Sequence, residues 1–204
     1  MQYQAYFWDF DGTLYDTYPV MVRAFGEALR QANIKVDLQE AYTIMRQASL
    51  STAFAHYVNP EQLAALKVQY QKLEASLADE VKPFKGAKEI CQKIVAQGGQ
   101  NFLLTHRDQS ALAFLKRDGL LPLFTDFVTS KQHFARKPDP ASLNYLLQKH
   151  QVSLTQAVMV GDRQLDVLAG QNAQIASVLF DPDNLIQATD WQPDIRIELL
   201  TDLK

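Results

Sequence analysis

The chain has 204 residues, of which 47% are hydrophobic and 21% are charged, and its formal net charge is −3. That length can bury a sizeable core, either as one domain or as one domain with an inserted subdomain, and the composition excludes a disordered chain. The slight negative charge gives no electrostatic reason to expect nucleic acid or an acidic membrane surface as a partner. Cys91 is the only cysteine, which excludes an internal disulfide and a thiolate metal cluster.

The sequence shows no targeting or membrane-spanning pattern. No basic segment followed by an apolar one begins the chain, and no apolar run reaches the length of about 18 residues that a spanning helix needs. We therefore expect a cytoplasmic protein.

Short apolar segments alternate with helical segments along most of the chain. The segments with a strand pattern are 4–9, 100–105, 125–130, 157–161 and 174–180, and those with a helical pattern are 87–97, 109–118, 140–150 and 163–170. Strands that alternate with helices form right-handed βαβ units around a parallel sheet. The pattern predicts a three-layer, Rossmann-like α/β fold with about five parallel strands.

Residues 17–82 interrupt this alternation, because they contain no strand pattern. A helical stripe of apolar residues comes first, formed by Met21, Ala24, Phe25, Ala28 and Leu29. Asn59 followed by Pro60 then has the form of a helix start. We predict an all-helical insertion over 17–82, within an α/β core formed by residues 1–16 and 83–204.

The first predicted strand ends in two acids, Asp9 and Asp11, which are followed by Gly12. Alternate strand residues point the same way, with Cα atoms roughly 6.5 Å apart, so both carboxylates would face one small space. An ordinary Asp-Gly turn at a strand end is the alternative explanation. The rest of the chain decides between them.

Further polar residues fall at the ends of other predicted strands. Thr105 closes the second strand, Asp162 closes the fourth, and Lys137 lies just before a helix. The carboxyl ends of parallel strands meet at one edge of a sheet, so these side chains should converge there. Asp166 follows Asp162 by four residues, and a helix that starts at Asp162 would hold both acids on one face.

This collection suits phosphoryl transfer. Several converging carboxylates require a hard cation, and oxygen ligands favour Mg²⁺. A lysine and a threonine can donate hydrogen bonds to phosphate oxygens. One carboxylate can attack phosphorus to form an aspartyl phosphate, and a second can protonate the leaving oxygen and later deprotonate the attacking water.

The motifs "DFDGTL", the threonine in "FLLTHRD", the lysine in "KPDP" and "GDRQLD" stand in order between residues 5 and 166. They resemble the four motifs of the haloacid dehalogenase-like (HAD) superfamily. The helical insertion is placed like the C1 cap of phosphoglycolate phosphatase-like and β-phosphoglucomutase-like members. The resemblance implies a HAD-like core with an α-helical cap domain.

The resemblance also implies a role for each matching residue. Asp9 would be the nucleophile and a Mg²⁺ ligand, and Asp11 the general acid and base, with its backbone carbonyl on the metal. The remaining implied roles are phosphoryl binding for Thr105 and Lys137, positioning of Asp9 for Lys137, metal binding for Asp162, direct or indirect metal binding for Asp166, and support of the Asp11 loop for Thr13. The dehalogenases of the superfamily typically lack the second acid, so Asp11 favours phosphate chemistry.

Two further residues are candidates for substrate binding. His106 follows Thr105 and could line the phosphate pocket, although it could also simply hydrogen-bond within its loop. Arg46 lies at a polar break in the helical insertion, where capped relatives place a substrate-selecting loop. An ordinary helix–helix connection is the alternative for Arg46.

The resulting hypothesis is a Mg²⁺-dependent phosphatase that hydrolyses a small phosphate monoester, such as a phosphoglycolate-like compound, a sugar phosphate or a nucleotide. The alternatives are a phosphomutase with the same site and a regulatory or binding protein that has lost turnover. We expect a small-molecule phosphate ester as the partner, no nucleic acid and no membrane, and a monomer or a homodimer.

Overall fold

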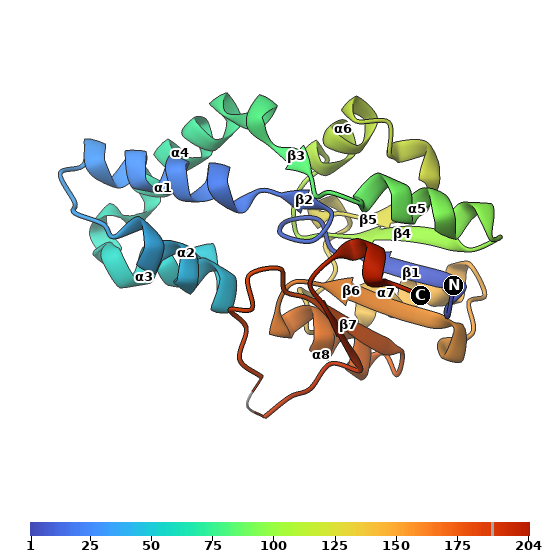
Figure 1. Ribbon diagram of the computed structural model, residues 1–204. Helices are drawn as coiled ribbons and strands as arrows, with labels where there is room; N and C mark the ends of the chain where they lie inside the picture. The colour runs from blue at the N-terminus through green and yellow to red at the C-terminus, as the bar shows by residue number, and fades with distance from the viewer. Residues whose placement is uncertain (189) are drawn as a thin grey trace. The chain divides into compact units, whose positions relative to one another are not determined.

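The computed structural model describes residues 1–188 and 190–204. The chain divides into two compact units, one formed by Met1–Tyr15 with Pro83–Lys204 and the other by Asp16–Lys82 (Figure 1). Each unit has its own hydrophobic core. Within the described ranges, no helix combines the length and the apolar character needed to cross a bilayer.

The first unit contains a six-stranded sheet in the order β5-β4-β1-β6-β7-β8, and each recorded pairing of neighbours is parallel. Its strands are β1 (Ala5–Trp8), β4 (Gln100–Leu104), β5 (Phe124–Val128), β6 (Ala157–Gly161), β7 (Ala176–Phe180) and β8 (Ile195–Ile197). The predicted parallel α/β architecture is confirmed, and the five predicted strands correspond to the first five of these. β1 and β6 are wholly buried, which explains their continuous apolar sequences.

The sixth strand, β8, corrects the expected number of about five. It has only three residues, and exposed Arg196 lies between Ile195 and Ile197. So short a segment at a sheet edge carries little periodic signal. Its position depends on tertiary contacts, because Arg196 forms an ion pair with buried Asp181, the residue that follows β7.

Four helices cover the two faces of the sheet, with α5 and α6 on one face and α7 and α8 on the other (Figure 1). Their bounds are α5 (Ala87–Ala96), α6 (Ser110–Arg117), α7 (Ala141–Lys149) and α8 (Gln164–Asn172). Phe7 stacks on Phe102 at 4.8 Å between ring centroids, in a cluster that includes apolar residues of α7 and α8. On the other face, Trp8 Nε1 donates to Asn101 Oδ1 at 2.9 Å, and Asn101 Nδ2 donates to the carbonyl of Cys91 in α5 at 3.1 Å. The sheet is therefore the middle of three layers.

The second unit is helical. It consists of α1 (Tyr18–Gln31), α2 (Leu38–Gln47), α3 (Leu50–Tyr57) and α4 (Pro60–Ser76). Its core contains four of the five residues of the predicted stripe as fully buried side chains, Ala24, Phe25, Ala28 and Leu29. α4 begins at Pro60 with Asn59 at the N-cap position, as predicted, although the Asn59 side chain makes no capping hydrogen bond.

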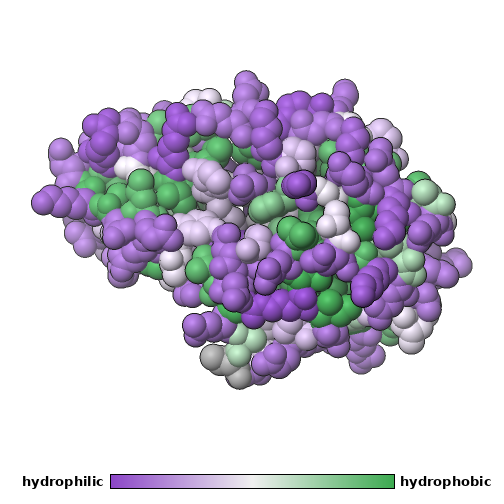
Figure 2. Space-filling model, viewed as in Figure 1, coloured by the Kyte–Doolittle hydropathy of each residue, from purple (hydrophilic) through white to green (hydrophobic). Residues whose placement is uncertain are grey.

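Two short strands, β2 (Tyr15–Asp16) and β3 (Lys82–Pro83), pair where the chain passes between the units. The described residues also form five short 3₁₀ helices: η1 (Ala78–Glu80), η2 (Leu121–Leu123), η3 (Ser130–Gln132), η4 (Leu154–Gln156) and η5 (Leu200–Asp202). The face shown in Figure 2 is mostly hydrophilic, with hydrophobic residues in patches between. The exposed large hydrophobic residues are spread over both units: Leu38, Val68, Val95, Tyr145, Leu154 and Leu199.

Candidate active site

Three of the predicted site residues follow directly on neighbouring strands. Asp9 comes after β1, Thr105 after β4 and Asp162 after β6. The strand hydrogen bonding continues one residue further at two of them, since Asp9 N donates to Val160 O at 2.9 Å and Thr105 N donates to Val128 O at 3.0 Å. Because β4, β1 and β6 are adjacent in the sheet, the three residues lie along one edge.

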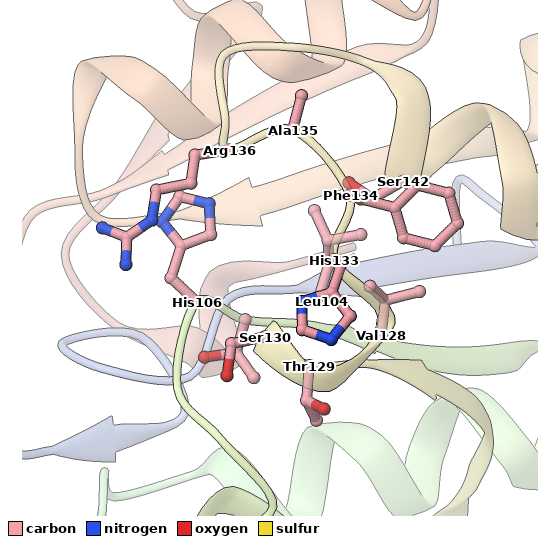
Figure 3. A pocket seen from close by; sticks show the side chains of 11 residues that line it. Leu104, His106, Val128, Thr129, Ser130, His133, Phe134, Ala135, Arg136 and Ser142 are labelled. Atoms are coloured by element: carbon pink, nitrogen blue, oxygen red, sulfur yellow. The ribbon is translucent and has the colours of Figure 1, made fainter.

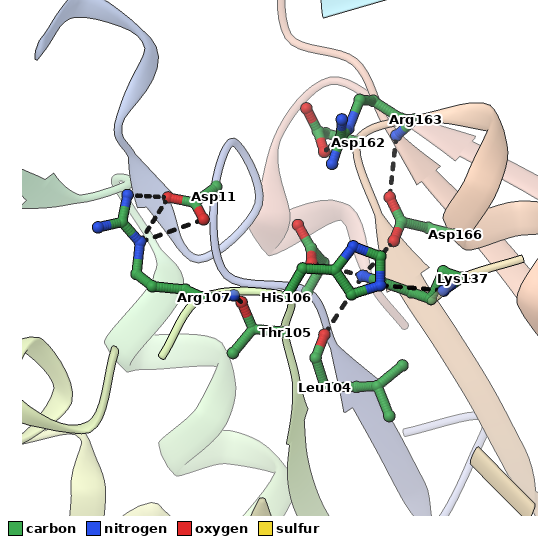
Figure 4. A network of polar contacts seen from close by, with 10 residues as sticks. Asp11, Leu104, Thr105, His106, Arg107, Lys137, Asp162, Arg163 and Asp166 are labelled. Carbon is green, nitrogen blue, oxygen red and sulfur yellow. Dashed lines mark hydrogen bonds and ion pairs between the residues drawn. The ribbon is translucent and has the colours of Figure 1, made fainter. Parts of the chain in front are cut away.

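Lys137 lies among these strand ends, and its side chain is 1% exposed. Its Nζ is 2.5 Å from Asp9 Oδ1, 2.5 Å from Asp166 Oδ1 and 3.2 Å from the carbonyl oxygen of Leu104 (Figure 4). Three acceptors match the three protons of an ammonium group. Burial, the largest single influence, lowers the pKa of Lys137, but the carboxylates of Asp166 and Asp9 together outweigh it and hold that pKa above its usual value. Lys137 is therefore a charged lysine that neutralises part of a buried acidic cluster.

Asp9 has one engaged oxygen and one without a partner. Oδ1 accepts from Lys137, whereas Oδ2 is buried and has no hydrogen-bond partner among the described residues. Burial raises the pKa of Asp9 to about 7, against the opposing effect of Lys137. A buried polar atom without a partner is costly, which marks Oδ2 as a place for an incoming ligand or reacting atom.

The acidic cluster fits a divalent cation. Asp9, Asp162 and Asp166 are all buried, and they offer carboxylate oxygens that lie within 4.8 Å of one another. Carboxylates are the ligands that hard cations such as Mg²⁺ take in proteins. This donor set makes the cluster the part of the described chain best suited to hold a metal ion.

Asp162 and Asp166 converge by a different route from the one expected from their spacing. α8 begins at Gln164, so Asp162 precedes the helix, and the prediction of two acids on one helical face is wrong. Arg163 between them is extended, with φ −136° and ψ 163°, which turns the chain from β6 into α8. Asp166 Oδ2 accepts from Arg163 N at 3.2 Å, and its Oδ1 faces Lys137.

Gly161 makes the close packing of Asp166 possible. A Cβ atom built on Gly161 would lie 2.2 Å from both Cβ and Cγ of Asp166, which is far too close for atoms that are not bonded. The last residue of β6 must therefore lack a side chain if Asp166 is to reach Lys137.

The second acid of the first motif, Asp11, has a partner that the sequence did not predict. Arg107 forms a bidentate ion pair with it: Nη2 is 2.8 Å from Oδ1, and Nε is 3.1 Å from Oδ1 and 3.2 Å from Oδ2 (Figure 4). The guanidinium carbon also lies 5.7 Å from the centroid of the Phe10 ring. Arg107 N donates to Thr105 Oγ1 at 3.0 Å, so the same residue contacts two predicted site residues. The one feature of the sequence that could have marked Arg107 as a site residue was its position two residues after Thr105.

The loop that carries Asp11 is held by its backbone. Gly12 has φ 79°, a left-handed conformation suited to glycine, and its N–H donates to Tyr15 O at 2.8 Å. Thr13 N donates to Phe10 O at 3.3 Å, while the buried Thr13 hydroxyl has no hydrogen-bond partner among the described residues. Backbone hydrogen bonds thus give this loop its shape.

The two remaining candidates have contacts of their own. His106 Nε2 accepts from Lys137 N at 2.9 Å, so the imidazole is neutral and supports the loop that carries the lysine. Burial, and next the charge of Lys137, lower the pKa of His106 to about 3. Arg46 belongs to the helical unit, where it is 1% exposed and its guanidinium carbon lies 5.2 Å from the centroid of the Tyr18 ring.

Comparisons with known proteins agree with this fold and these motifs. A family model described as haloacid dehalogenase-like hydrolase matches residues 6–180. A phosphoglycolate phosphatase of Vibrio cholerae is 27% identical over 179 residues, which cover 81% of this chain and 78% of that protein. The pyrophosphatase PpaX of Listeria welshimeri is 25% identical over 203 residues, which cover 96% of this chain and 92% of that protein.

A solved structure is also similar. The crystal structure of a hydrolase from Streptococcus pneumoniae matches with a TM-score of 0.69 and 34% identity, over 88% of this chain and 94% of that chain. The chain belongs to the haloacid dehalogenase-like hydrolase family. Its relatives place it among the phosphatases of that family.

Proposed function

We propose that this protein is a Mg²⁺-dependent phosphatase that hydrolyses a small-molecule phosphate monoester through an aspartyl phosphate on Asp9. The observation that carries the proposal is the state of the Asp9 carboxylate: Lys137 holds Oδ1 at 2.5 Å, and Oδ2 is buried without a hydrogen-bond partner among the described residues. A carboxylate fixed by one oxygen presents the other in a defined direction, which a nucleophile needs. The similarity to a phosphoglycolate phosphatase and to a pyrophosphatase supports a small phosphate compound as the substrate.

In the first step, Asp9 Oδ2 attacks phosphorus, the bond between phosphorus and the ester oxygen breaks, and the leaving oxygen takes a proton from Asp11. In the second step, Asp11 takes a proton from water, the resulting hydroxide attacks phosphorus, and the aspartyl bond breaks to release phosphate and restore Asp9. The Thr105 hydroxyl donates a hydrogen bond to a phosphoryl oxygen. Lys137 does the same once it exchanges its contact with the Leu104 carbonyl for a phosphoryl oxygen. The Asp11 carboxyl must release its ion pair with Arg107 and contact the leaving oxygen before it can transfer a proton.

Asp9, Asp162 and Asp166 would hold the Mg²⁺ ion. When bound, the ion reduces the repulsion between the anionic nucleophile and the anionic phosphate. The helical unit would serve as the cap that selects the leaving group. Arg46, the predicted contact in that unit, is buried there, so it could only support the cap from within. The small ester remains the only partner that we propose, with no nucleic acid or membrane, and the cytoplasm as the compartment.

Phosphate release from a panel of esters tests this function. The panel contains phosphoglycolate, sugar phosphates, nucleoside monophosphates and p-nitrophenyl phosphate, each with Mg²⁺ and with EDTA. Asp9→Asn should lower kcat by roughly 10⁴-fold or more, because it removes the nucleophile. Asp79→Asn, an equal change at an exposed position of the helical unit, should leave kcat unchanged.

Release by the wild type that requires Mg²⁺ and is lost in Asp9→Asn would support the proposal. Normal turnover in Asp9→Asn, with an unfolding curve like that of the wild type, would refute the role of Asp9. Labelled phosphoryl groups that pass to a sugar hydroxyl rather than to water would show a phosphomutase instead.

A further inference from the structure

A cavity of about 290 Å³ opens beside the candidate active site, within the α/β unit (Figure 3). It lies where β4 and β5 end, next to η3 and the loop of residues 133–136. Thr105 and His106 are part of its lining, so the cavity adjoins the predicted phosphoryl site. No role in the proposed reaction accounts for the rest of it.

The lining combines an apolar floor with a polar rim that contains no carboxylate. Leu104 and Val128 form part of the floor, whereas Arg136, Ser130 and Ser142 add polar groups. An arginine and two histidines are the only titratable side chains among the lining residues. A pocket with a cation, hydroxyl groups and no acid is complementary to an anion.

Arg136 is the charged group of this rim. It is exposed, and among the described residues no carboxylate forms an ion pair with its guanidinium, which extends beside the His106 ring (Figure 3). The planar guanidinium matches the two oxygens of a carboxylate or a phosphate. The cation of the cavity is therefore available to a ligand.

Ser142 adds a second donor. Ser142 is 4% exposed, and it lines the cavity. It lies in the first turn of α7, where backbone N–H groups lack carbonyl partners within the helix. The nearest acid in sequence, Asp139, lies outside the lining, and its carboxylate already accepts from Ala141 N at 2.8 Å.

We propose that this cavity binds an oxyanion, a carboxylate or a phosphate, with Arg136 and Ser142 as its main donors. The anion has two possible sources. One is a second anionic group of the substrate, a reading that rests on the proposed phosphatase function, and the other is free inorganic phosphate. His106 connects the cavity to the predicted phosphoryl site, because it lines the cavity and accepts a hydrogen bond from the backbone N–H of Lys137.

A pair of esters tests the first source. Phosphoglycolate carries a carboxylate beyond its phosphate, and 2-hydroxyethyl phosphate has a neutral hydroxymethyl group there. Arg136→Gln should lower the ratio of their kcat/KM values by roughly tenfold, the loss expected for one charged hydrogen-bonding pair. Arg136→Lys should keep part of the ratio, and Lys116→Gln, the same charge change at an exposed position of α6 away from the cavity, should keep all of it.

Calorimetric titration with inorganic phosphate, at constant ionic strength and in EDTA, tests the second source without requiring turnover. Binding that is lost in Arg136→Gln but kept in Lys116→Gln, with an unchanged ester ratio, would identify free phosphate as the ligand. Ser130→Asp, which adds a negative charge to the rim, should weaken binding from either source. If Arg136→Gln changes neither the ester ratio nor phosphate binding, the cavity is not an anion site, whether or not the protein hydrolyses esters.

Discussion

Replacing Lys137 with methionine should be among the most destabilising changes in the α/β unit. Methionine keeps an apolar stem of similar length but removes the charge that lies 2.5 Å from both Asp9 Oδ1 and Asp166 Oδ1. At an effective dielectric constant of 20, each such contact represents about 7 kcal/mol of gross attraction, which the cost of burying the charges largely offsets. Removing one partner of a buried ion pair leaves the other uncompensated, so we expect the free energy of unfolding to fall by about 3–5 kcal/mol.

Urea denaturation followed by tryptophan fluorescence measures this loss. Both tryptophans of the chain, Trp8 and Trp191, are buried in the α/β unit, so their emission reports on that unit. Lys149→Met is the matched control, because Lys149 Nζ also forms an ion pair, at 2.7 Å from the carboxylate of Asp126, but its side chain is 47% exposed. Exposed ion pairs contribute up to about 1 kcal/mol, so the free energy of unfolding of Lys149→Met should differ little from that of the wild type.

Mg²⁺ provides the second measurement on the same variant. A cation bound by Asp9, Asp162 and Asp166 would replace part of the missing positive charge, so added Mg²⁺ should raise the denaturation midpoint of Lys137→Met more than that of the wild type. If Lys137→Met is no less stable than Lys149→Met, the lysine is not what makes the buried acids tolerable. The electrostatic account of the site would then be refuted.

Two further predictions concern residues that support this site. Burial and the charge of Lys137 lower the pKa of His106 to about 3. As the pH falls, the His106 imidazole is therefore protonated near pH 6.5 in the unfolded chain but stays neutral in the folded chain. The contribution of His106 to the free energy of unfolding should thus be fully present above pH 6.5 and fall as the pH drops towards 3. His106→Gln should reduce that fall by on the order of 1 kcal/mol between pH 7 and 5, after allowance for solvent screening, and equal pH slopes in urea unfolding would contradict this. Gly161→Ala should cost about 1–3 kcal/mol and weaken Mg²⁺ binding in a calorimetric titration, because the new Cβ would displace Asp166; unchanged Mg²⁺ affinity would show that Asp166 is not needed for it.

Much of the fold was predictable because it depends on local pattern. Continuous apolar segments such as β6 and the helical stripe of α1 carry a period that does not depend on distant residues. Asp9, Thr105 and Asp162 could be assigned to one sheet edge because each follows a strand and because parallel strands end together. β8 was missed because three residues at an edge show no usable period.

The charge partners were less predictable, because they depend on how distant segments pack. Arg107 lies 96 residues from Asp11 in the sequence, and Lys137 lies 29 residues from Asp166; neither pairing was predicted. The start of α8 at Gln164 was also set by tertiary context, since the turn from β6 brings Asp166 to Lys137.

The parallel α/β class, the helical segment and the set of residues at the strand ends could all be read from the sequence, because hydrophobic periodicity and strand direction act locally. Which of those charges meet depends on how the strands and loops pack in three dimensions. The strand order β4-β1-β6 places Lys137 between Asp9 and Asp166 and brings Arg107 to Asp11. The physical reason is that an ion pair is a short-range contact across the fold, and spacing along the chain carries no record of it.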